Sequence, residues 1–388
     1  MGYARKTSAR PPQQRQSVEA AAPAKGKQTS IWNMQIGGTK AKTTMKRVEV
    51  LLFTSELADL IEAGMTLGQA LAALANQGEE GSAMRFVCGD LRDRIVRGES
   101  FSDACAHHPA TFEPLYSNMI RAAEASGAMV DVLRRLADHY ERSDNMRGKI
   151  KSALSYPIVV LCFGIFAVIG ALVWIVPQFQ KVFDSLGATL PLPTRILIGM
   201  SDFVTQYGWA LLLAAVAFAF WFRKWKKTEA GRLKIDGWKL KAPLVKGIVA
   251  CGAYSSLAYT LKTLLVNGVN VLQALKISEE TCGNAVIGAA LATARKRVTD
   301  GTSISGPLAS SGVFPRMMTD MLAIGEQAGD MVSSLEHIGK RYQKDMDRNI
   351  ATFTNALEPI LIVSIAGIVA FLAIAILSAV FQASNALS

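Results

Sequence analysis

The histidines and cysteines are the residues of this chain best suited to metal binding or nucleophilic chemistry, and their spacing favours neither. His107 and His108 are adjacent, while His139 and His337 stand alone, so no second ligand pair follows at the spacing of a metal site. We therefore expect solvated or helix-capping roles for the histidines. The five cysteines form no CxxC pair and are odd in number, which favours scattered reduced thiols over a disulfide framework or a zinc site. They are Cys88, Cys105, Cys162, Cys251 and Cys282.

The sequence also lacks the common catalytic motifs. It contains no G-x-x-x-x-G-K-[ST] phosphate-binding loop, no H-E-x-x-H zinc motif and no G-x-S-x-G nucleophile turn. No group of residues combines a nucleophile, a base and metal ligands. We therefore expect that the protein is not an enzyme and needs no cofactor.

Two glutamates are the strongest candidates for a functional role, because each belongs to a phrase that occurs twice. "RAAEASGAMVDVLRRLADHYER" starts at Arg121, and "AIGEQAGDMVSSLEHIGKRYQK" starts at Ala323. The matching residues, each pair 202 positions apart (326 − 124 = 202), are Glu124 and Glu326, Gly127 and Gly329, and Tyr140 and Tyr342. A constant separation across three residue types indicates an internal duplication.

The two carboxylates allow two interpretations. Glu124 and Glu326 lie near predicted helix C-termini, where the helix dipole disfavours an acid that has no partner. We favour the structural interpretation, a hydrogen bond to the adjacent turn at Gly127 or Gly329. The functional interpretation is that the carboxylates bind an ion or a partner protein.

Short amphipathic helices are expected to position these residues. The first copy opens with apolar residues at helical spacing, and Gly64 follows as a predicted C-cap. A T-x-x-Q capping box then starts at Thr66. The second copy repeats this order with Gly268 as C-cap, then Asn270 as N-cap and Gln273 as its return partner. "GESFS" (98–102) and "GTSIS" (301–305) add a matching turn with an N-capping serine. Each copy therefore reads as a bundle of about six short helices, and the fold class is all-α.

Three apolar segments are long enough to cross a membrane as helices. Segments 158–176 and 360–381 contain no charged residue, and segment 203–222 carries Trp and Phe at its ends. Pro157 and Pro359 are expected to start the first and third spans, where a missing N–H is tolerated. Glu358 lies at the predicted membrane boundary, so this acidic residue is also a functional candidate.

The distribution of basic residues predicts the orientation of these spans. Lys and Arg gather before the first span, after the second and before the third, which places the N-terminus in the cytoplasm and the C-terminus outside. The predicted order is a disordered tail without a signal peptide (1–47), a first cytoplasmic bundle (48–156), a span (157–176), a periplasmic loop (177–202), a span (203–222), a basic cytoplasmic linker (223–250), a second bundle (251–358), a span (359–381) and a periplasmic tail (382–388).

The composition agrees with charged domains joined to membrane spans. Half of the chain is apolar and its mean hydropathy is +0.24, yet its formal net charge is +11. Attraction to anionic lipid beside the cytoplasmic ends of the spans accounts for this charge, so we expect no nucleic-acid binding.

In combination these features resemble the GspF/PilC family, the inner-membrane platform proteins of type IV pilus and type II secretion systems. The resemblance rests on the duplicated bundles, the E-x-x-G phrase before a long helix, and "VPQFQKVFDSLGATLPLPTRIL" (176–197), which is close to the family pattern after the first span. It covers the chain from about residue 48 to residue 381.

The resemblance implies a role in the bacterial inner membrane. The expected partners are a hexameric cytoplasmic assembly ATPase, pilins or pseudopilins, other inner-membrane assembly proteins and further copies of the chain. Some cytoplasmic domains of the family are thought to bind a divalent ion, for which Glu124 would be the candidate ligand. We favour pilus assembly, with secretion as the alternative and a small membrane transporter as a remote one.

Overall fold

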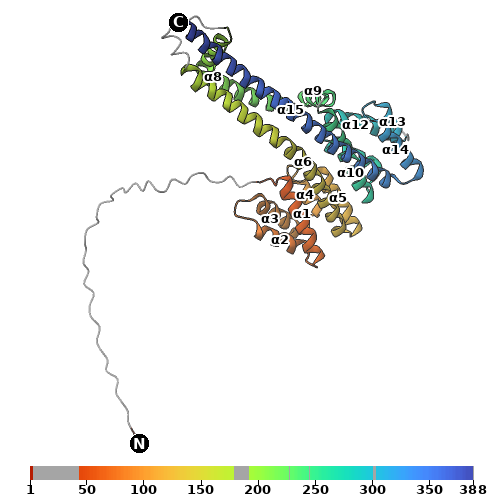
Figure 1. Ribbon diagram of the computed structural model, residues 1–388. Helices are drawn as coiled ribbons and strands as arrows, with labels where there is room; N and C mark the ends of the chain where they lie inside the picture. Colours follow the sequence, from red (N-terminus) through yellow and green to blue (C-terminus); the bar gives the residue numbers. More distant parts are fainter. Residues whose placement is uncertain (3–42, 179–191, 227, 244, 300–302, 388) are drawn as a thin grey trace. The chain divides into compact units, whose positions relative to one another are not determined.

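The computed structural model describes residues 1–2, 43–178, 192–226, 228–243, 245–299 and 303–387, and every regular element in them is a helix (Figure 1). The all-α prediction is therefore confirmed for this part of the chain. Most of the predicted tail (1–47) and the centre of the predicted periplasmic loop (177–202) lie outside the described residues.

The helices form two sets with the same order and similar lengths. The first set is α1 (Arg47–Glu62), α2 (Leu67–Gln77), α3 (Ala83–Val96), α4 (Phe101–Ala106), α5 (Pro114–Ser126) and α6 (Met129–Gly170). The second set is α10 (Lys246–Val266), α11 (Val271–Thr281), α12 (Ala285–Thr299), α13 (Ser305–Ser310), α14 (Arg316–Ala328) and α15 (Met331–Leu387). A short π-helix, η1 (Ala171–Ile175), extends α6, and α8 (Leu192–Trp225) and α9 (Glu229–Lys241) connect the sets. The match between the sets supports duplication.

Local capping explains where several helices begin and end. Thr66 and Gln69 exchange the predicted capping-box hydrogen bonds at 3.4 and 3.2 Å. Asn270 caps α11 by accepting the N–H of Leu272 at 2.9 Å. The prediction for Gln273 was wrong, because its side-chain amide does not return to this cap but donates to Asn118 of α5 at 3.0 Å. A contact between the two copies thus replaces a local one.

The two copies share one buried core. A single apolar cluster contains Phe53 and Tyr116 from the first set together with Leu257 and Leu335 from the second. Helix α6 contacts α10 and α15, and α5 contacts α11. The two helix sets therefore pack against each other in the described part of the chain.

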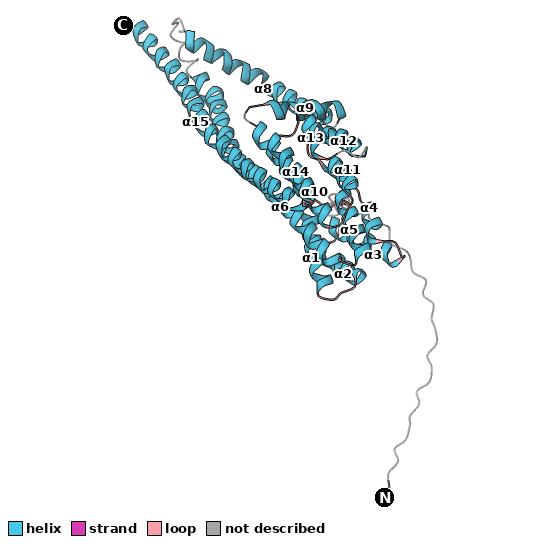
Figure 2. Ribbon diagram, turned by 90° about the vertical axis from the view of Figure 1, so that its right-hand side faces the viewer, coloured by secondary structure: helices cyan, strands magenta, loops and turns pink. Residues whose placement is uncertain are grey.

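The two longest helices continue through the prolines that were expected to start membrane spans. Pro157 lies inside α6 and Pro359 inside α15, so the prediction that each begins a helix was wrong. Proline removes one backbone hydrogen bond. The residues before it form an amphipathic helix that packs against α1 or α10, and the residues after it are continuously apolar, so helix is favoured on both sides. Figure 2 shows α6 and α15 running side by side.

Other boundaries also differ from the sequence prediction. Helix α8 begins at Leu192, inside the segment 177–202 that was expected to be a loop. The expected linker 223–250 contains all of α9 and the start of α10. Both segments contain charged and polar residues, which is why they were predicted as loops.

Four helices in the described part of the chain are long and apolar enough to cross a membrane: α6 with η1, α8, α10 and α15. They differ in how much of their most apolar stretch is buried inside the protein. That share is 44% for α10 but 6%, 0% and 11% for α6, α8 and α15. Helix α10 is therefore largely an internal helix of the second set, whereas the other three present apolar side chains outward.

Candidate functional site

Glu124 fixes the end of α5 to the start of α4. One carboxylate oxygen accepts the backbone N–H of Phe101 at 2.6 Å, and the other accepts the N–H of Ser102 at 3.4 Å. These are donors of the first helical turn, which have no partner within their own helix. The positive end of the α4 dipole also favours a carboxylate at this position.

Glu326 makes the same arrangement in the second copy. Its carboxylate accepts the backbone N–H of Ile304, the N–H of Ser305 at 3.1 Å and the hydroxyl of Ser305. We call these two arrangements, centred on Glu124 and Glu326, the carboxylate clamps. Both acids therefore form hydrogen bonds, as predicted. The predicted partner was wrong, because each carboxylate accepts from the start of another helix and not from the turn that follows its own helix.

The glycines after the clamps end the helices that carry the glutamates. Gly127 and Gly329 both have a φ of +72°, the left-handed conformation that favours glycine at a helix C-terminus. The N–H of Gly329 bonds to the backbone carbonyl of Glu326 at 3.3 Å. Gly64 and Gly268 have φ values of +90° and +75°, but each lies one residue beyond the C-cap, which is Ala63 in α1 and Asn267 in α10.

The clamps do not have the chemistry of a metal site. Among the residues that the structure describes, no group of three His, Cys, Asp or Glu side chains is placed to hold a metal ion. Both carboxylate oxygens of Glu124 face N–H donors, which would repel a cation. The geometry gives no support to the divalent ion that the family resemblance implied for Glu124.

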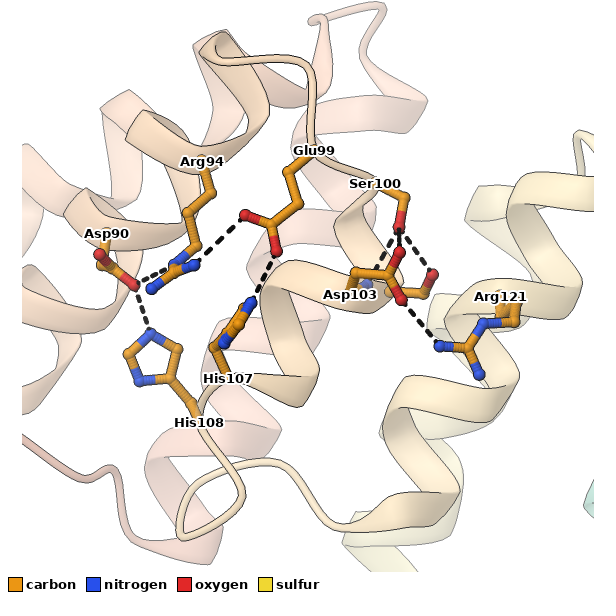
Figure 3. A network of polar contacts seen from close by, with 9 residues as sticks. Asp90, Arg94, Glu99, Ser100, Asp103, His107, His108 and Arg121 are labelled. Carbon is orange, nitrogen blue, oxygen red and sulfur yellow. Dashed lines mark hydrogen bonds and ion pairs between the residues drawn. The ribbon is translucent and has the colours of Figure 1, made fainter.

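The first copy carries a polar network that the sequence analysis missed (Figure 3). Arg94 of α3 pairs with Asp90 at 2.7 Å and with Glu99 at 3.3 Å. His108 contacts Asp90 at 2.8 Å, and His107 contacts Glu99 at 2.9 Å. The expectation of a solvated or capping histidine was wrong for His108, which is half-buried against Asp90 of α3. It is confirmed for His107, which is exposed and is the C-cap residue of α4.

This network also shifts the pKa of Asp90, the acid at its centre. Burial alone would raise the pKa of Asp90, but hydrogen bonds from Arg94 and His108 outweigh it and lower that pKa below its ordinary value. A second pair, Asp103 with Arg121 at 2.9 Å, joins α4 to α5 beside the Glu124 clamp. Helix α4 is therefore held from both sides by charged contacts.

The second copy lacks the charges of this second pair. At the repeat spacing, Gly306 corresponds to Asp103, and Ala323 corresponds to Arg121. Repeated residues therefore do not point to this pair, because it belongs to one copy only. The clamps are common to both copies, whereas the charged surface around α4 distinguishes the first.

Polar contacts also join the two copies. Arg135 of α6 donates to the side-chain oxygen of Asn267 at 2.9 Å, and Arg142 stacks over the ring of Tyr259 with its guanidinium carbon 5.0 Å from the centroid. Lys149 pairs with Asp347 at 2.7 Å. These contacts connect α6 to α10 and α15.

The remaining sequence candidates lie elsewhere. Tyr140 and Tyr342 are buried core residues that contact Tyr116 and Tyr254. Glu358 is exposed on α15 beside Pro359. The structure brings none of these residues into a clamp.

Comparison with known proteins gives matches over both copies. The model of the family described as "Type II secretion system (T2SS), protein F" matches residues 53–177 and 257–379. The chain is 36% identical to the type IV pilus assembly protein PilC of Thermus thermophilus, over 88% of this chain and 84% of the relative. It is 34% identical to the type II secretion system protein F of Aeromonas hydrophila, over 87% of each chain. It is 30% identical to PilC of Myxococcus xanthus, over 90% of this chain and 82% of the relative. These matches confirm the resemblance inferred from the sequence.

Proposed function

Because this chain belongs to the type II secretion system protein F family, we propose that it is a non-enzymatic platform protein of the inner membrane in type IV pilus biogenesis. In this role it couples a cytoplasmic assembly ATPase to the insertion or removal of pilin subunits. The similarity to PilC of Thermus thermophilus along most of both chains is the observation that supports the proposal. The relatives are named as assembly and secretion-system proteins, which favours a role without catalysis.

The equivalent platform of a type II secretion system is the second candidate. It is favoured by the similarity to protein F of Aeromonas hydrophila, which is 34% identical, close to the 36% for PilC. Both kinds of relative align with the same two copies, so the choice between the systems needs an experiment.

We propose three membrane spans, formed by the apolar parts of α6 with η1, α8 and α15. We do not count α10 as a span, because 44% of its most apolar stretch is buried in the protein. Basic residues next to the three spans favour a cytoplasmic N-terminus, two cytoplasmic helix sets and a periplasmic C-terminus. An inner membrane of a bacterium is the membrane in which pilins and an ATPase-driven platform would meet.

The long helices suit a protein that transmits movement. Helix α15 has 57 residues, roughly 85 Å at 1.5 Å per residue, and it continues from the second helix set into a proposed span. Helix α6 does the same for the first set. A displacement of either set by an ATPase would therefore move a span directly, without a flexible joint.

An apolar groove is a suitable place for a pilin transmembrane helix. A cavity of about 390 Å³ lies between α6 with η1, α8 and α15, and Leu172, Leu197 and Phe371 line it. Gly367 also borders it, and a small residue allows the backbones of two helices to approach closely. Other inner-membrane assembly proteins or a second copy of the chain are further partners of these exposed apolar helices.

A clean deletion in the native host tests the proposal. Surface filaments and secreted proteins are scored in parallel, and the wild-type gene is returned on a plasmid as the control. Loss of filaments with normal secretion would support the pilus role. Loss of secretion with normal filaments would assign the protein to a secretion system. If the complemented and deleted strains do not differ in either property, the platform proposal is contradicted.

A further inference from the structure

A basic cavity lies where the last turns of α8 meet α9. Its volume is about 810 Å³, and it also borders Gly283, which precedes α12. Figure 2 shows the end of α8 leading into α9. Five cationic residues line the cavity: Arg223, Lys224, Lys226, Arg232 and Lys239. A cavity with this lining would attract an anion.

Its single acidic residue is already neutralised. Asp236 is buried, pairs with the side chain of Lys239 at 2.9 Å, and accepts the backbone N–H of Ala285 at 3.1 Å. It therefore fixes α9 to the first turn of α12 and is not available to the other cations. No carboxylate in the described part of the chain pairs with the remaining four, Arg223, Lys224, Lys226 and Arg232. The cavity thus keeps an excess of positive charge.

The α8 side of the cavity carries an aromatic side chain beside the cations Arg223 and Lys224. Phe220 lines it, and its side chain is 75% exposed. Trp221 and Trp225 stack nearby with ring centroids 6.2 Å apart, and Phe222 contacts Trp225 at 6.0 Å. Aromatic side chains of this kind gather at the interface between membrane and water. A ligand of this cavity would therefore be anionic at one end and apolar at the other.

We propose that this cavity binds the phosphate of an anionic phospholipid headgroup. Lysine and arginine supply the charge, and the aromatic end of α8 contacts the first carbons of the acyl chains. A free phosphate would be bound by the same cations but would not contact Phe220. The lipid therefore fits the cavity better. The proposal rests on the proposed span in α8, but not on a role in pilus assembly or secretion.

The test uses the full chain purified in a neutral detergent. The protein is mixed with equal amounts of phosphatidylglycerol and phosphatidylcholine, and bound lipid is measured by native mass spectrometry. We expect the wild type to retain phosphatidylglycerol in preference. Lys224→Gln with Lys226→Gln should weaken its binding about fivefold for each lysine removed. Arg232→Gln, on a different helix, should also weaken it.

Lys234→Gln with Lys241→Gln is the matched control. It removes the same charge from exposed lysines of α9 that do not line the cavity, and it should leave binding unchanged. Equal losses in both double variants, or no lipid preference in the wild type, would overturn the proposal. Binding of inorganic phosphate without a preference for phosphatidylglycerol would also overturn it and identify a soluble anion as the ligand. Because no ATPase or pilin takes part, this result is independent of the deletion phenotype.

Discussion

At the scale of single residues, Glu124 and Glu326 show how one acid can order two helices. Each glutamate is on the last turns of one helix, where its charge is unfavourable, and it bonds to the first turn of another, where its charge is favourable. Helices α4 and α13 are only six residues long and cannot be stable alone. The clamps therefore add to the core packing of Phe101 and Leu308, which also holds these two short helices in place.

Removing one clamp should destabilise the protein. We expect Glu326→Ala to lower the free energy of unfolding by about 1–2 kcal/mol, because backbone N–H groups lose a charged acceptor. Glu326→Arg should cost more, because it also brings a positive charge to the positive end of α13. The measurement is the thermal midpoint of the full chain in detergent. Glu280→Ala, an exposed acid on α11, is the control; a clamp variant that melts like this control would contradict the role.

His139 should make stability depend on pH. Burial, together with the charges of Arg47 and Arg142, lowers its pKa from 6.5 to about 4. Between these values the unfolded chain binds a proton that the folded chain does not bind. Stability is therefore fully present above about pH 6.5 and falls as the pH drops toward 4, by no more than about 1.4 kcal/mol per pH unit.

The thermal midpoint measured between pH 7.5 and pH 4.5 tests this prediction. His139→Gln removes the titrating group, so its midpoint should fall less over this range than that of the wild type. His337→Gln, which changes an exposed histidine on α15, should follow the wild-type curve. Parallel curves for all three proteins would show that His139 does not contribute.

At the scale of helices, the features that could be predicted from the sequence were the local ones. The capping box at Thr66 and the helix-ending glycines depend on neighbours within a few residues, so the pattern identified them. The continuation of α6 through Pro157 could not be predicted in this way, because it depends on packing against α1. The partners of His108 and Gln273 also come from other helices. Sequence patterns therefore located the helices better than they located the contacts between them.

Two glycines of the first helix set should respond in opposite ways to alanine. Gly127 has a φ of +72°, so Gly127→Ala should lower stability by about 1 kcal/mol. Gly148 is inside α6, and an added methyl group would meet no atom within 4 Å. Gly148→Ala should raise stability by up to about 1 kcal/mol, because alanine favours a helix. A thermal midpoint of Gly127→Ala at or above that of the wild type would show that the left-handed turn is not what constrains Gly127.

At the scale of the whole molecule, the orientation of the spans is the first quantity to establish. Basic residues after α8 favour a cytoplasmic position for α9. An alkaline phosphatase fused after Leu240, in α9, should therefore be inactive. A fusion at Leu186, which lies outside the described residues, should be active. Immunoblots of both fusions control for their amounts, and the reverse pattern of activity would contradict the proposed topology.

The shared core leads to a last prediction about cooperativity. Buried residues of both copies form one cluster, and polar contacts from Arg135 and Gln273 cross between them. If the copies depend on one another in this way, Glu124→Ala and Glu326→Ala should each shift a single unfolding transition of the full chain.

Calorimetry and circular dichroism in the same detergent measure this cooperativity. The two methods should give coincident midpoints for the wild type and for each variant, because one cooperative unit unfolds as a whole. Two resolved transitions, with Glu124→Ala moving only one and Glu326→Ala only the other, would mean that the copies unfold independently. In that case a force on one helix set could distort that set without reaching the other. A single transition would instead mean that a force on one set is transmitted to the other, and with it to α6 and α15.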